Sequence, residues 1–228
     1  MNQKNFLTLR DKVAELFILR ASGSRFDCQR KYPKWELSNT ELLNFLEIGI
    51  GGVIFFGGTI FELQNKCKLI QDHSNKSLLL CADVEEGVGQ RFEGATTLIP
   101  PFGVAQIYKK SREKGLDFAE KYGECIGEQA KQAGLNWVLA PVCDVNTNIK
   151  NPVINMRAWG DDAEMASLLI EAFQKGLHSK GVLSCAKHFP GHGDTSIDSH
   201  LDLPVLHHDF SRLNRIEFIP FRASSPVS

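Results

Sequence analysis

Short apolar runs alternate with longer amphipathic stretches along most of this chain, and that alternation restricts its possible folds more than any other feature. The runs predicted as strands are Val13–Leu19, Gly51–Phe56, Ser77–Val84, Asn136–Val145 and Val182–His188. The stretches predicted as helices are 39–47, 59–72, 111–133 and 161–179. Strands that alternate with helices through short connections form parallel β/α units. The sequence therefore predicts an α/β protein.

Polar side chains at the ends of the predicted strands favour a barrel over a doubly wound sheet. Asp83 and Glu85 follow the third predicted strand, and Asp144 follows the fourth. Lys187 and His188 close the fifth. The carboxyl ends of parallel strands share one rim, and TIM barrels carry their active sites there. We therefore predict a TIM (β/α)8-type barrel that is incomplete, because only about five of its eight β/α units are expected.

Charge and composition exclude several classes of protein. The formal net charge is −1, so the chain has no general attraction to nucleic acid or to an anionic membrane. No segment approaches the roughly 18 to 20 apolar residues of a membrane span, and the N-terminus shows no secretory signal pattern. Six cysteines occur without a CxxC pair, which is typical of reduced thiols in a cytosolic protein. We expect a cytoplasmic protein with no nucleic acid and no membrane partner.

The segment that follows the fifth predicted strand has the strongest chemical character. Residues 186–200 hold three histidines, two aspartates and a lysine among glycines and a proline. Asp198 and His200 are two positions apart, so both side chains project the same way if the segment is extended. A neighbouring carboxylate raises the pKa of an imidazole and fixes its tautomer. His200 is therefore a candidate general acid and base, with Asp198 as its partner.

Two other interpretations of this segment are open. The histidines could be part of a polar loop in which they only form local hydrogen bonds. A zinc site is the second, because imidazole and carboxylate are good zinc ligands. Its ligands would come from His188, His192, His200, Asp194 and Asp198. The spacing is not one of the strong zinc patterns, so we expect neither a metal nor a cofactor.

The same segment resembles a known family signature. Residues 187–193, with the letters KHFPGHG, are followed by DSH at 198–200. This resembles the motif of glycoside hydrolase family 3, in the N-terminal domain of its bacterial β-N-acetylglucosaminidase (β-N-acetylhexosaminidase) branch. The resemblance implies that His200 is the catalytic acid and base and that Asp198 is its partner. It also implies that Lys187 and His188 hold sugar hydroxyls.

Two further segments resemble the same family. Residues 83–92 are similar to its pattern Asp-x-Glu-Gly-Gly-Arg-Val-x-Arg-Phe, and Asp83 and Arg91 match sugar-binding positions. The middle of this segment departs from the pattern at Glu86, Val88 and Gly89. Residues 151–160 resemble the segment that supplies another substrate-binding arginine, here Arg157.

The resemblance implies a glycosidase that removes terminal, non-reducing, β-linked N-acetylglucosamine by a retaining double displacement. The implied partner is a small carbohydrate, an N-acetylglucosaminyl glycoside or a muropeptide, in cytoplasmic peptidoglycan recycling. No cofactor and no metal are implied. Transfer of the glycosyl group to phosphate instead of water is a close variant that the sequence leaves open.

A retaining glycosidase needs a second carboxylate as nucleophile. In the family this is an Asp in a Ser-Asp-Asp-like strand end near the seventh strand, which would lie beyond Ser228. We therefore expect residues 1–228 to be a single catalytic-type domain that lacks its C-terminal part and its nucleophile. The alternative function is that of a truncated remnant that is inactive or only binds sugar. Uncovered sheet edges also predict a chain that is poorly soluble or oligomeric by itself.

Overall fold

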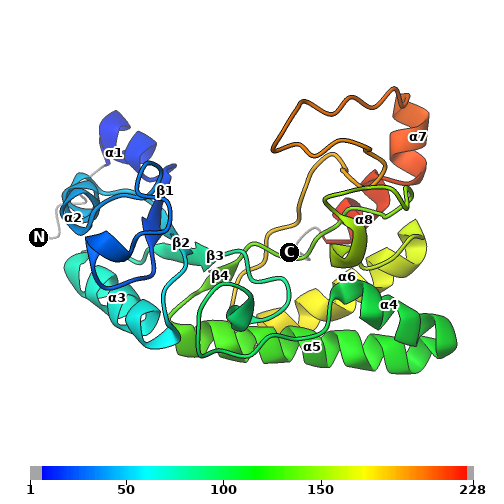
Figure 1. Cartoon of the computed structure of the whole chain (residues 1–228), viewed down its shortest axis with the longest axis horizontal. Helices are drawn as coiled ribbons and strands as arrows, with labels where there is room; N and C mark the ends of the chain where they lie inside the picture. The colour runs from blue at the N-terminus through cyan, green and yellow to red at the C-terminus, as the bar shows by residue number, and fades with distance from the viewer. Residues whose placement is uncertain (1–6, 225–228) are drawn as a thin grey trace, which may run out of the picture.

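The computed structural model describes residues 7–224, so the first six and last four residues of the predicted domain lie outside it. Its centre is a parallel sheet of four strands in the order β1-β2-β3-β4. The strands are β1 (Ile18–Ser22), β2 (Gly52–Phe56), β3 (Leu79–Ala82) and β4 (Trp137–Val138). Strand order follows chain order, as it does around a TIM barrel. The α/β prediction is confirmed, and the ribbon forms an open arc that corresponds to part of such a barrel (Figure 1).

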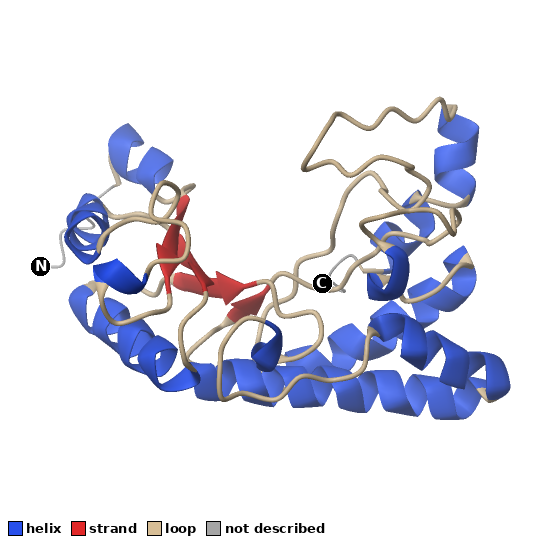
Figure 2. Cartoon of the chain, viewed as in Figure 1, coloured by secondary structure: helices blue, strands red, loops and turns tan. Residues whose placement is uncertain are grey.

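Eight helices and three 3₁₀ turns accompany the sheet within residues 7–224 (Figure 2). The α-helices are α1 (Leu9–Ala14), α2 (Asn39–Ile48), α3 (Ile60–His73), α4 (Pro101–Lys110), α5 (Arg112–Ala133), α6 (Ala163–Ser179), α7 (Phe210–Arg215) and α8 (Phe218–Ala223). The 3₁₀ turns are Asp27–Gln29, Val88–Gln90 and Asn155–Arg157. No helix in the described part of the chain is both long and apolar enough to span a bilayer.

Capping side chains explain where several predicted helices begin. A capping box starts α2, since the Ser38 hydroxyl accepts from the Glu41 backbone and the Glu41 carboxylate accepts from Ser38 N–H. A capping box at Thr59 starts α3 in the same way. The helix α4 was not predicted, although Pro101 at its first position is a recognised start signal.

The prediction of a strand over residues 13–19 was wrong for residues 13–17. Thr8 and Asp11 form a capping box, which starts α1 and keeps the chain helical to Ala14. The strand β1 begins only at Ile18. A short apolar run can belong to a helix or a strand, and here the cap decides which.

The fifth predicted strand is in its expected place but is not a regular strand. Residues 182–188 run parallel to β4 and to the chain that follows it, and meet them in isolated bridges, Trp137 with Leu183 and Val142 with Lys187. Pro141 lies between these bridges and has no N–H to donate, which interrupts a continuous ladder. The predicted strand over 136–145 is therefore only two residues long as β4.

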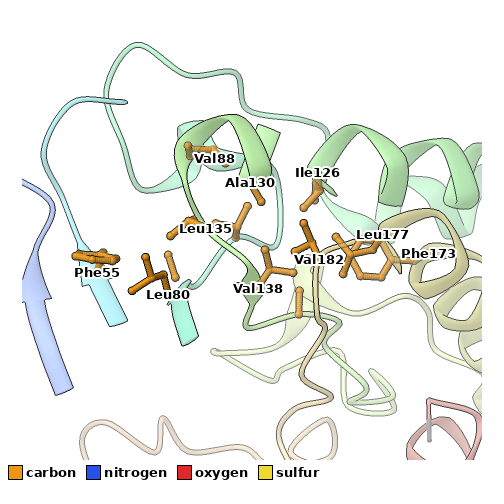
Figure 3. Packing of buried hydrophobic residues seen from close by; sticks show 14 of the residues in the cluster. Phe55, Leu80, Val88, Ile126, Ala130, Leu135, Val138, Phe173, Leu177 and Val182 are labelled. Carbon is orange, nitrogen blue, oxygen red and sulfur yellow. The ribbon is translucent and has the colours of Figure 1, made fainter. Parts of the chain in front are cut away.

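The core lies between the sheet and the long helices α5 and α6 (Figure 3). Ile126 of α5, Phe173 of α6 and Val138 of β4 are all fully buried. The two helices approach closely at glycines: a Cβ on Gly123 would lie 2.0 Å from the Phe173 carbonyl oxygen, and one on Gly176 would clash with α5 in the same way. This packing holds the segments after β3 and β4 at one edge of the sheet.

Candidate active site

Charged side chains from three separate segments meet beyond the carboxyl ends of β3 and β4. We call Asp83, Glu85, Arg91, Arg157 and Lys187 the rim cluster. The Lys187 Nζ lies 2.8 Å from Asp83 Oδ1 and 2.6 Å from Glu85 Oε1. The structure therefore brings together residues that are 104 positions apart in sequence.

Glu85 and Arg157 form the best-defined ion pair of the rim cluster. The guanidinium Nε and one terminal nitrogen of Arg157 each donate to a separate Glu85 oxygen at 2.8 Å. Such two-point pairs fix both distance and orientation. Burial of Glu85 by itself would raise its pKa, but hydrogen bonds from Arg157 and the charge of Lys187 lower that pKa to about 2. Glu85 is therefore an ionised, buried carboxylate that orients two cations.

Arg91 completes the rim cluster on its more exposed side. Its Nε donates to the Asp83 carbonyl at 3.2 Å, and a terminal nitrogen lies 3.8 Å from Asp83 Oδ2. Four of the five predicted sugar-binding residues, Asp83, Arg91, Arg157 and Lys187, are thus joined by ion pairs directly or through Glu85.

His188, the fifth predicted sugar-binding residue, is held by a different carboxylate. Its Nδ1 lies 2.6 Å from Oδ2 of Asp144, which is completely buried. Asp144 also accepts from the backbone N–H groups of His188 and His192. A carboxylate at Nδ1 favours the tautomer with its proton there, which leaves Nε2 of His188 for a ligand.

Glu85 and Asp144 were missing from the predicted site residues. Both follow predicted strands, but the sequence by itself assigns neither of them a role. A usable signal existed for Asp144, the one acidic residue in the predicted strand 136–145, because a buried carboxylate needs a charged or hydrogen-bonding partner. Glu85 has no such signal, since residues 83–86 hold three acidic side chains.

The predicted acid/base pair is present but lies apart from the rim cluster. His200 Nδ1 is 2.8 Å from Asp198 Oδ1, which also accepts the His200 backbone N–H at 2.9 Å. The backbone N–H and then the imidazole of His200 lower the pKa of Asp198. The His200 side chain is 80% exposed, and within residues 7–224 no hydrogen bond or ion pair joins it to the rim cluster.

These two residues belong to a long connection that we call the histidine loop, residues 191–208. It extends from the fifth sheet segment to α7 and arches away from the sheet (Figure 1, orange). Its first part is fixed by Asn151, which is buried and donates to the carbonyl of His192 at 2.7 Å. His192 in turn contacts Thr195 Oγ1 through Nδ1 and Ser199 Oγ through Nε2.

The side chains that the zinc interpretation would need are directed to separate partners. His188 faces Asp144, His192 faces two hydroxyls and His200 faces Asp198. In the described part of the chain, no group of three His, Cys, Asp or Glu side chains is arranged to hold a metal ion.

Comparison with known proteins adds independent information. The family model for the glycosyl hydrolase family 3 N terminal domain matches residues 8–225. A beta-hexosaminidase A from Pseudoalteromonas piscicida is 33% identical over 217 residues, which cover 88% of this chain and 35% of that protein. A beta-hexosaminidase from Tolumonas auensis is 33% identical over 181 residues, covering 78% of this chain and 53% of that one. The chain thus spans about half or less of these relatives.

Solved structures agree with the sequence relatives. A glycoside hydrolase family 3 beta-N-acetylglucosaminidase from a Paenibacillus species superposes with a TM-score of 0.78 at 30% identity, over 96% of this chain and 40% of that one. NagZ from Neisseria gonorrhoeae, in complex with N-trifluoroacetyl-D-glucosamine, gives a TM-score of 0.77 at 28% identity, over 90% of this chain and 59% of that one.

Proposed function

The chain belongs to glycosyl hydrolase family 3, and we propose that it supplies the sugar-binding and acid/base groups of a β-N-acetylhexosaminidase. The substrate would carry a terminal, non-reducing, β-linked N-acetylglucosamine. The observation that carries this proposal is the rim cluster, with the ordered His188 beside it. A structural relative that was solved with an N-acylated glucosamine supports the choice of sugar.

The rim cluster suits a ring of neighbouring hydroxyl groups. Asp83 offers acceptor oxygens, while Arg91, Arg157 and Lys187 offer donors, so vicinal hydroxyls can bridge an acceptor and a donor. Glu85 holds two of these donors in position without being exposed itself. Preorganised charge of this kind binds a polar ligand without reorganisation of the protein.

The proton transfer would be performed by His200. We propose that the histidine loop moves towards the rim cluster when sugar is bound. His200 would then protonate the glycosidic oxygen as a carboxylate nucleophile bonds to the anomeric carbon and the leaving group departs. It would later take a proton from the water that releases the sugar from that carboxylate. Asp198 would hold the imidazole and stabilise its charged form.

The source of the nucleophile decides between turnover and binding alone. Asp83, Glu85 and Asp144 all lie in the segments after β3 and β4, and each is already held by a cationic or imidazole partner. We propose that none of them is the nucleophile of the double displacement. This favours sugar binding without turnover as the second candidate function for the 228 residues by themselves.

The biological setting that we propose is the cleavage of muropeptide-derived sugars during peptidoglycan recycling in the cytoplasm. It rests on the resemblance of the KHFPGHG and DSH segments to the bacterial branch of the family.

A binding experiment tests the proposed function. We expect saturable binding of N-acetylglucosamine by titration calorimetry, and at least a tenfold rise in Kd for Lys187→Met, because the Asp83 and Glu85 carboxylates lose their shared cation. Lys175→Met is the matched control, since Lys175 is exposed on α6 and pairs only with Glu120. Release of nitrophenol from its β-N-acetylglucosaminide then separates turnover from binding. A wild-type chain that does not bind the sugar contradicts the proposal.

A further inference from the structure

The histidine loop is closed near its ends by a second histidine–aspartate contact. His208 Nε2 lies 2.7 Å from Asp194 Oδ2, which joins residues 14 positions apart. Arg212 of α7 lies 3.6 Å from the same Asp194 oxygen. All three side chains are mostly buried, with 21–27% of their area exposed. The contact is therefore better shielded from water than the Asp198–His200 pair.

The same network attaches the loop to the two last helices. Arg212 also lies 3.1 Å from an oxygen of Glu217, which is buried next to α8. At the start of the loop, a Cβ on Gly191 would lie 2.8 Å from the Glu217 Cβ. Both ends of the histidine loop therefore rest on one framework made of α7, α8 and the side chain of Glu217.

Between these ends, the loop has few restraints of its own. Within the described residues 7–224, the hydrogen bonds made by residues 196–207 remain inside the loop, such as Ser199 with His192 and His200 with Asp198. The side chains of Leu201 and Leu203 are 85% and 79% exposed, so packing does not hold the tip either. The position of His200 thus depends on where the loop ends are fixed.

We propose that Asp194, His208 and Arg212 form a clasp that positions the Asp198–His200 pair. These are positioning residues that act through His200, and the inference rests on the proposed function. Opening the clasp lengthens the free segment and multiplies its conformations, so the share of molecules with His200 in reach of bound sugar falls.

Hydrogen exchange of the loop amides tests whether the clasp exists. In the full chain, His208→Ala should speed exchange in residues 196–207 at least tenfold, with the amides of β2 and β3 unchanged. His208→Gln, which can still donate to Asp194, should restore most of the protection. Asp202→Asn is the matched control in the same loop, because the Asp202 carboxylate accepts only from the next backbone N–H. Unchanged loop exchange in both His208→Ala and Asp194→Asn would overturn the inference.

A second measurement separates positioning from a purely structural role. Saturating N-acetylglucosamine should slow exchange at residues 198–202 of the wild type, as the loop moves onto the sugar. The clasp variants should lose that protection while their Kd for the sugar changes less than threefold, since the rim cluster is intact. Equal protection in variants and wild type contradicts the positioning role. If the wild type binds no sugar, the proposed function is contradicted. Hydrogen exchange of the loop amides in the free protein would still show whether the clasp exists.

Discussion

The rim cluster and the Asp198–His200 pair are both charged sites of the same proposed reaction, but they are built in opposite ways. Arg157 and Glu85 are 72 positions apart in sequence, and the Glu85 side chain is only 2% exposed. Asp198 and His200 are two positions apart, and the imidazole is largely in solvent. The fold fixes the first site, whereas local bonds and the ends of a loop fix the second. A rigid binding surface can therefore be combined with a group that moves to the bond it protonates.

The largest expected effect comes from removing the imidazole of His200, which belongs to the exposed pair. His200→Ala should lower turnover of an N-acetylglucosaminide by roughly 100- to 10,000-fold, the usual contribution of a general acid and base. Substrates with poorly acidic leaving groups should suffer most, because they depend most on protonation. Steady-state kinetics on substrates with a series of leaving groups measures the ratio of turnover between wild type and His200→Ala. The assay uses a form of the protein that hydrolyses these substrates. An activity loss that is small and equal across the series would remove the acid/base assignment.

In the buried rim cluster, substitution of Glu85 should lower the free energy of unfolding. Glu85→Gln leaves Arg157 without its anion and Lys187 with Asp83 alone in a mostly buried place, so we expect a loss of about 3 kcal/mol in the free energy of unfolding. Urea denaturation followed by circular dichroism measures it. Glu120→Gln is the control, because the Glu120–Lys175 pair is exposed and should contribute below about 0.5 kcal/mol. Similar losses in both variants would mean that the rim cluster is not held by Glu85.

The pH dependence of stability sharpens the same contrast. The pKa of Glu85 is lowered from its ordinary 4.5 to about 2 in the folded protein. Its contribution is therefore complete above pH ~4.5 and is lost as the pH falls towards 2, a change on the order of 3 kcal/mol at 1.36 kcal/mol per pKa unit. The stability difference between wild type and Glu85→Gln should shrink across this window. A difference that stays constant down to pH 2 would contradict the assignment.

The smallest effect on stability is expected when the same carboxylate-to-amide change is made in the histidine loop. Asp198→Asn also converts a carboxylate to an amide, yet its partner His200 is exposed, so the free energy of unfolding should stay nearly unchanged. Turnover should still fall, because an amide does not stabilise a charged imidazole. A stability loss as large as that of Glu85→Gln would erase the distinction between the two regions.

The sequence was sufficient for the parts of the molecule that depend on local pattern. The amphipathic and apolar runs located α2, α3 and β2 to within one or two residues. The first strand was misplaced because the cap at Thr8 outweighed an apolar run. The family resemblance picked out Lys187 and Arg157, but their anchor Glu85 emerges only from a contact across 72 positions. The separation of His200 from the rim cluster was beyond prediction, since it depends on how α7 and α8 hold the loop.

The separation in sequence between residues of the rim cluster has a consequence for synthesis of the chain. Asp83 and its cation Lys187 are 104 residues apart, which at roughly 5–20 residues per second means about 5–20 s of translation. During that time the emerging β3 end carries two carboxylates whose lysine has not yet been made. The sugar-binding surface therefore cannot be completed before residue 187 has been made, and a bound sugar would report that the Asp83–Lys187 contact has formed.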